Sequence, residues 1–231
     1  MRRVVSILKT KSSELVFRPS IKCSIVPNTR HYASLSTSVC WNCQKPAKQM
    51  ICADCGSLQD VDNTINYFKL LDFPTQFTLQ SQQLTQRFRQ LQSRVHPDKY
   101  SNKTSREQTN SADWSSLINK AYKTLSAPVE RGQYMLQLAG EEMPQDNSAL
   151  NATFLMAMME RNEEVEEADN SAALEKLSAN ISQELEAFAE KLTTQFEAND
   201  LAAVKATLVE MKYLHSIQSS IKKKQQHLMS A

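Results

Sequence analysis

The sequence predicts an all-α protein with three parts: a small N-terminal metal-binding module, a helical hairpin and a C-terminal three-helix bundle. Only three of the 231 residues are glycine, which argues against tight-turned β architectures and glycine-rich phosphate loops. Apolar residues recur instead at helical spacing, and no proline follows Pro144. No apolar run approaches the roughly 20 residues that a membrane-spanning helix needs, so no membrane partner is expected.

Residues 1–38 predict a mitochondrial transit peptide. They carry seven basic residues and one acid, Glu14, among apolar and hydroxyl residues. An Arg-rich, acid-poor and weakly amphipathic leader is typical of proteins imported into the mitochondrial matrix, and Arg30–Ser34 resembles a processing region. A disordered basic tail is the alternative interpretation.

Residues 39–60 predict a metal-binding module. Two C-x-x-C pairs, eight residues apart, are formed by Cys40, Cys43, Cys52 and Cys55. Two such pairs complete a tetrahedral S4 shell, for which a structural Zn2+ is the leading interpretation and an iron–sulfur cluster the second. A third is two disulfides, which a reducing matrix disfavours. Because the span is too short for a core of its own, the metal should supply its folding free energy.

A zinc ribbon that binds nucleic acid fits this composition poorly. Lys and Arg number 27 against 25 Asp and Glu, which gives a formal net charge of +2. Asp54 stands inside the second cysteine pair, few basic residues flank the pairs, and Glu163–Glu167 form an acidic run. We therefore expect no nucleic-acid partner.

Residues 64–140 predict two amphipathic helices. Ser81 is a candidate N-cap for the first helix, and Pro128 should stop the second. The apolar stripes of the two helices are Leu84, Phe88, Leu91 and Val95, followed by Trp114, Leu117, Ile118, Ala121 and Leu125.

A proline separates the two predicted helices. Because Pro97 disfavours helical geometry in the residue before it, the first helix should end at about His96. A polar connector should then run over 100–110. Two antiparallel helices would leave His96-Pro97-Asp98 exposed at their joint.

These segments resemble the J-domain of DnaJ-type Hsp70 co-chaperones. The matching motifs are Tyr67-Phe68-x-Leu70, Arg87-Phe88-x-x-Leu91-x-x-x-Val95-His96-Pro97-Asp98-Lys99 and Ile118-Asn119-x-Ala121-Tyr122-x-x-Leu125. The resemblance implies that His96, Pro97 and Asp98 contact the Hsp70 ATPase domain and trigger ATP hydrolysis. It also implies that basic residues on the preceding helix bind an acidic Hsp70 surface. No nucleophile, second acid or phosphate cradle accompanies His96, so we expect no catalysis by this chain.

Helical geometry selects among the basic residues. Arg87 and Arg94 lie within about 20° of each other on one flank of the apolar stripe, whereas Arg89 points elsewhere. Together with Lys99 beyond the turn, these two arginines should steer docking through charge complementarity. Ordinary solubilising surface charge is the alternative.

Residues 147–229 predict the three-helix bundle. We expect one helix from about Leu150 to Ala168, a second that carries the apolar stripe of 174–192, and a third that begins near Leu201. Short connectors around Asn170 and at 199–200 make neighbouring helices antiparallel.

The first of these helices has apolar residues outside its core face. Leu155 and Met159 lie about 100° from the face that contains Met158, in line with Glu163, and Tyr213 points away from the stripe of the last helix. Exposed leucine, methionine and tyrosine beside carboxylates favour protein docking. A bundle that buries both faces is the alternative.

The order of cysteine pairs, J-domain and helical C-terminal domain is similar to the mitochondrial HscB-type co-chaperones of iron–sulfur cluster biogenesis. Phe154-Leu155-Met156, Met159-Glu160 and Glu163-Glu164 resemble the scaffold-binding segment of that family, and Met211-Lys212-Tyr213-Leu214 resembles its counterpart on the last helix. By this similarity, the contacts to an IscU-type iron–sulfur scaffold would come from Leu155, Met159, Glu160, Glu163 and Tyr213. Bacterial members lack the cysteine pairs, which leaves the role of the module open.

The sequence thus predicts an adaptor of the mitochondrial matrix and not an enzyme. The bundle would hold the cluster-loaded scaffold while His96-Pro97-Asp98 engages a mitochondrial Hsp70, so that ATP hydrolysis coincides with client capture and promotes cluster transfer. One alternative is a J-domain co-chaperone for another mitochondrial client. Another is a metal or cluster carrier that acts through its C-x-x-C pairs. A homodimer is a further hypothesis about partners.

Overall fold

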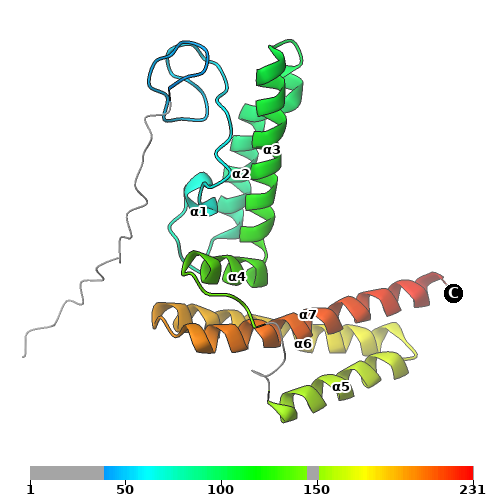
Figure 1. Cartoon of the computed structure of the whole chain (residues 1–231). Coiled ribbons are helices and arrows are strands. Elements are labelled where there is room, and N and C mark those ends of the chain that lie inside the picture. Colours follow the sequence, from blue (N-terminus) through cyan, green and yellow to red (C-terminus); the bar gives the residue numbers. More distant parts are fainter. Residues whose placement is uncertain (1–38, 145–150, 231) are drawn as a thin grey trace, which may run out of the picture. The chain divides into compact units, whose positions relative to one another are not determined.

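The computed structural model describes residues 39–144 and 151–230 (Figure 1). Helices dominate these two ranges, which contain two isolated β-bridges and no β-strand. The all-α prediction is therefore confirmed. Among the described helices, none combines the length and hydropathy required of a membrane span. The predicted transit peptide lies outside the described residues.

The predicted hairpin is built from four α-helices and one 3-10 turn. They are α1 (Tyr67–Leu70), α2 (Ser81–Val95), η1 (Pro97–Tyr100), α3 (Ser105–Ser126) and α4 (Pro128–Leu138). Side-chain hydrogen bonds pair the end of α2 with the start of α3 and the start of α2 with the end of α3, so the two helices are antiparallel (Figure 1). As predicted, α2 ends just before His96 and α3 ends before Pro128. This proline begins α4, where its missing N–H costs nothing.

Two predicted features at helix starts were wrong. Ser81 is the first residue of α2 and not its N-cap, which is Gln80 without a capping side chain. The helix α3 begins at Ser105, so the polar connector is shorter than the predicted range 100–110. The hydroxyl of Thr104 caps α3 by accepting the N–H of Glu107 at 3.3 Å. This pair was readable in the sequence as a capping box, but the polar first turns carry no apolar periodicity.

The apolar stripes of α2 and α3 meet in one buried cluster with α1. Its members include Phe68, Leu71, Leu84, Leu91, Val95, Trp114, Ile118 and Leu125. At its edge Phe88 stacks on Tyr122, with the ring centroids 4.2 Å apart. Full burial of each such side chain contributes about 1.5–3 kcal/mol, so this cluster holds the hairpin together.

The C-terminal bundle consists of α5 (Ala152–Glu167), α6 (Ser171–Glu197) and α7 (Leu201–Ser230). Asn170 caps α6 by accepting the N–H of Ala173 at 2.9 Å, and Asn199 takes a left-handed conformation after it, with φ of 55°. The bundle core contains Met158, Val165, Leu174, Ile181, Leu185, Leu192, Val204, Leu208, Met211 and Leu214. The predicted three-helix bundle is confirmed (Figure 1).

A buried arginine lies where the hairpin meets the bundle. The guanidinium Nη1 of Arg131 donates to the Leu125 carbonyl at 2.6 Å, and its Cζ lies 4.7 Å from the ring centroid of Phe77. The Phe77 ring stacks in turn on Phe196 of α6, at 5.4 Å between centroids. Burial lowers the pKa of Arg131 to about 10, so the side chain stays charged at neutral pH.

Gly132 sets the approach of α4 to α7, because a Cβ atom there would lie 2.6 Å from Cδ2 of the buried Leu208. Gly132→Val should lower the free energy of unfolding by about 1–3 kcal/mol through overpacking, measured by urea denaturation. Glu130→Val, exposed on the same helix, is the matched control and should cost less. Adding Leu208→Ala to Gly132→Val should relieve the clash. An equal loss for the two valine variants would contradict the close approach.

Candidate functional site

All four predicted cysteines of the cysteine module (residues 39–60) come together. Their sulfur atoms lie within 4.8 Å of one another, with 3.6 Å between Cys40 and Cys55 and 3.7 Å between Cys43 and Cys52. Disulfide bonding requires about 2.05 Å, and all four cysteines are free. A tetrahedral ion with bonds of about 2.3 Å to sulfur separates its ligands by about 3.8 Å. The donor set therefore fits a single ion better than a cluster, whose own atoms would hold the thiolates further apart.

The two cysteine pairs have the same backbone geometry. In each, the N–H of the first cysteine donates to the carbonyl of the fifth residue after it, at 2.8 and 3.0 Å. The residue four positions after that cysteine donates back to the cysteine's carbonyl, and it has a positive φ of 61° at Gln44 and 75° at Gly56. Each turn thus points both sulfurs of a pair toward the same point.

Hydrogen bonds around two sulfurs favour the thiolate. Burial acts to raise the pKa of Cys40, but the backbone N–H groups of Cys43 and Asn42, 3.5 and 3.4 Å from its sulfur, lower it overall. Hydrogen bonds with the side chain and backbone of Ser57 lower the pKa of Cys55 to about 6. Because the thiolate is the ligand form of cysteine, these contacts prepare the site for a cation.

The His96-Pro97-Asp98 tripeptide is exposed at the joint of α2 and α3, with 55% of the His96 side chain and 89% of the Asp98 side chain accessible. The Nδ1 atom of His96 accepts the backbone N–H of Asp98 at 3.3 Å and thereby caps η1. The same Nδ1 atom lies 3.4 Å from a carboxylate oxygen of Asp98. The turn is therefore ordered by its own histidine while its outer surface stays available.

The predicted basic residues fall into two environments. Arg94 and Lys99 are exposed and form no ion pair with any described residue. Arg87 is half-buried, with Nη2 3.5 Å from a carboxylate oxygen of Asp72 and Nη1 donating to Gln90 at 3.4 Å. Since ion pairs of this kind near the surface contribute little, Arg87 could exchange Asp72 for a partner's carboxylate at small cost.

On α5, the predicted docking residues lie on the side away from the core. Met159 is 64% exposed, Glu160 and Glu163 are exposed, and Leu155 is half-buried. Met156 stands in the matching motif but not among the predicted contact residues, and it is 63% exposed on the same side. Its position three residues before Met159 could have identified it.

Tyr213 does not point away from the apolar stripe, so this prediction was wrong. Its ring is half-buried and meets the Phe154 ring edge-on, with the centroids 6.1 Å apart. The reason is that α5 runs parallel to α7 and covers that flank of α7. Tyr213 therefore lies at the edge of the exposed side of α5 and packs against Phe154.

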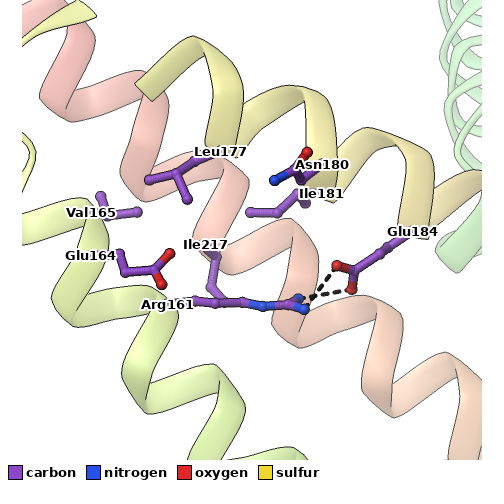
Figure 2. Close-up of a pocket in the computed structure, with 8 residues that line it drawn as sticks. All are labelled: Arg161, Glu164, Val165, Leu177, Asn180, Ile181, Glu184 and Ile217. Carbon is purple, nitrogen blue, oxygen red and sulfur yellow. Dashed lines mark hydrogen bonds and ion pairs between the residues drawn. The ribbon is translucent and has the colours of Figure 1, made fainter. Parts of the chain in front are cut away.

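Polar contacts fix how α5 sits on its neighbours. A pocket between α5, α6 and α7 is lined in part by Arg161 and Glu184, which form two hydrogen bonds of 2.8 Å each (Figure 2). At the end of α5, Nζ of Lys224 donates to the Glu166 carbonyl at 2.7 Å. These contacts join α5 to both partner helices and keep its methionine side outward.

Comparison with known proteins gives two family matches. A model described as the DnaJ domain matches residues 66–134, and one described as the HSCB C-terminal oligomerisation domain matches residues 150–222. These ranges contain the J-domain motifs and the C-terminal motifs on which the resemblance rests, whereas the cysteine pairs lie outside them.

Individual relatives match over most of their length. The human iron–sulfur cluster co-chaperone protein HscB is 36% identical, over 80% of this chain and 81% of its own. The Arabidopsis thaliana homologue is 27% identical, over 84% of this chain and 77% of its own. The crystal structure of human HscB superposes with a TM-score of 0.76 at 35% identity, covering 81% of this chain and 98% of that one. Vibrio cholerae HscB gives a TM-score of 0.64 at 30% identity, covering 71% of this chain and 99% of that one.

The positive φ at Gly56 predicts that a branched side chain at this position weakens metal binding. Gly56→Val should weaken metal retention by about tenfold or more, because a β-branched residue in this conformation costs about 1–3 kcal/mol. Competition with a chelator measures this. At the equivalent position of the first pair, the reverse change, Gln44→Gly, relieves a positive φ and should retain the metal as well as wild type. Equal retention by the valine variant would contradict the turn geometry.

Proposed function

The chain belongs to the HscB family of J-domain co-chaperones, and from that premise we propose that it stimulates a mitochondrial Hsp70 and delivers an IscU-type iron–sulfur scaffold to it. The observation that carries this proposal is the exposed His96-Pro97-Asp98 turn at the joint of α2 and α3. The human, mouse and plant relatives, which are named for iron–sulfur clusters, support the client assignment. The chain itself performs no bond chemistry.

Hsp70 engagement would use the turn and the end of α2. Unpaired positive charge at Arg94 and Lys99 steers an acidic surface toward the tripeptide, and Arg87 joins by releasing Asp72. The ordered turn presents His96 and Asp98 without a folding cost at the moment of contact.

Scaffold engagement would use the outer side of α5. Met159 and Met156 offer adaptable apolar area, Leu155 adds a partly buried anchor, and Glu160 and Glu163 supply charge around them. Tyr213 contributes at the border of this surface. The outer side of α5 would thus capture the scaffold while the tripeptide triggers ATP hydrolysis by Hsp70. Both events act on the same scaffold, which promotes transfer of the scaffold's cluster.

The cysteine module would hold a structural Zn2+ through Cys40, Cys43, Cys52 and Cys55, supported by sulfur separations that suit one tetrahedral ion. The ion supplies a cross-link between the two turns and no reaction. Location in the mitochondrial matrix is proposed from the basic, acid-poor residues 1–38. The homodimer stays a prediction.

His96→Gln should lower the stimulation of Hsp70 ATP hydrolysis by at least about tenfold, equivalent to about 1.4 kcal/mol of interaction free energy. The substitution removes the imidazole that caps η1 and faces solvent. Single-turnover ATPase rates, with and without scaffold, measure the effect, and His215→Gln on the exposed side of α7 is the matched control. Full stimulation by His96→Gln would refute the co-chaperone assignment.

Leu155→Ala combined with Met159→Ala should weaken scaffold binding by about 10- to 100-fold, because large apolar anchors dominate such interfaces. Isothermal titration with purified scaffold gives the affinity. Leu228→Ala with Met229→Ala removes an exposed leucine and an exposed methionine from the end of α7 and should leave the affinity unchanged. Met156→Ala should weaken binding on its own. If the α5 and α7 double variants bind alike, the scaffold docks elsewhere.

A further inference from the structure

The first turns of α3 hold two separate structures at once. One is the cysteine module, and the other is the tripeptide loop, defined here as residues 96–104. The two contact different sides of the same short stretch of helix, Ser105–Trp114. A contact that fixes this stretch of α3 therefore affects both the cysteine module and the tripeptide loop.

The link to the cysteine module runs through a buried asparagine. The amide of Asn110, which is 5% exposed, donates to the Leu58 carbonyl at 3.0 Å and to a carboxylate oxygen of Asp60 at 2.9 Å. One turn earlier, Arg106 pairs with the same Asp60, at 3.1 Å from its Nε, and lies 4.8 Å from the Trp41 ring centroid. The segment 57–60 is thus fastened along one side of α3.

These contacts continue to a metal ligand. The side-chain amide of Gln59 donates to the Cys40 sulfur at 3.3 Å, and its backbone carbonyl accepts the indole N–H of Trp114 at 2.8 Å. The indole N–H of Trp41, the residue after that ligand, donates to the Leu58 carbonyl at 2.8 Å. Leu58 itself is fully buried in the hairpin core.

The opposite side of the same turns holds the tripeptide loop. The side-chain amide of Gln108 donates to the Ser101 and Lys103 carbonyls at 2.9 and 3.0 Å. Beside Asn110, the fully buried Ser111 donates to the Val95 carbonyl at 2.7 Å, where α2 ends. Both ends of the loop are therefore bonded to α3.

The part of the cysteine module around the sulfurs has little core of its own. Apart from Leu58, which packs into the hairpin core, its buried apolar residues are Cys40, Ala47 and Cys52, so its fold depends on the metal. When the cysteine turns unfold, 57–60 loses the bond from the Gln59 amide to the Cys40 sulfur and the bond from the Trp41 indole to the Leu58 carbonyl. The segment that supplies both acceptors of the buried Asn110 amide is then held less firmly, and because an unpaired buried amide is unfavourable, the start of α3 loosens with it.

We propose that metal binding by the cysteine module positions the His96-Pro97-Asp98 loop through α3, with Asn110 as the positioning residue. Metal occupancy would then set how strongly the chain engages Hsp70, which makes the J-domain responsive to metal supply or thiol oxidation. The consequence for Hsp70 rests on the function proposed above. The coupling between metal and loop does not.

Hydrogen exchange of the full chain tests the coupling without Hsp70. Removing zinc by chelation should speed exchange over 96–111 by about tenfold, as expected for the loss of a buried hydrogen-bond network, with no change in α5–α7. Asn110→Leu should produce the same increase with zinc still bound, as metal content verifies. Lys45→Ala, which breaks the exposed 2.7 Å ion pair with Asp54 inside the module, is the matched control and should change neither property.

Assays of Hsp70 ATPase stimulation test the consequence of this coupling for Hsp70. The chelated protein and zinc-loaded Asn110→Leu should both need about tenfold more protein for half-maximal ATPase stimulation, in step with the change in exchange. Unchanged exchange over 96–111 in either the chelated protein or Asn110→Leu would overturn the proposal. If the zinc-loaded wild type fails to stimulate Hsp70 while the exchange results hold, the proposed function is wrong and the coupling stands.

Discussion

The helix α2 ends at Val95, because Pro97 disfavours helical geometry in His96, whose backbone is extended with ψ of 131°. The Val95 carbonyl, left without a helical partner, accepts the Ser111 hydroxyl at 2.7 Å, and the Val95 side chain is fully buried against α3. This junction turns the backbone outward and leaves His96 and Asp98 in solvent at a fixed point on the hairpin. The position of the exposed basic residues of α2 and the position of the α3 residues that bind the cysteine module both depend on the pairing of these two helices.

In the bundle, most of the buried core and the exposed methionines lie on different helices. The helices α6 and α7 share most of the core, whereas α5 fully buries only Met158 and Val165. Such a narrow buried stripe leaves Met156 and Met159 available to a partner. The ion pair of Arg161 with Glu184 compensates, because it fixes the rotation of α5 without adding apolar area.

Local patterns predicted most of this structure. Burial follows the 3.6-residue period, so the stripes of α2, α3 and the bundle were readable, and the family resemblance is confirmed. The four cysteines were found because C-x-x-C spacing is local. The packing of Tyr213 was not, since it depends on which flank of α7 is covered by α5. Nor was the role of Asn110, whose acceptors Leu58 and Asp60 are 50 or more residues away in sequence.

Titrating the isotope-labelled chain with the ATPase domain of an Hsp70 tests the central claim most directly. If the proline-broken joint is the Hsp70 contact, backbone NMR signals should shift at His96–Lys99 and along the Arg87–Arg94 side of α2, with those of α5–α7 unchanged. Shifts confined to the bundle, with the tripeptide signals unmoved, would contradict the account.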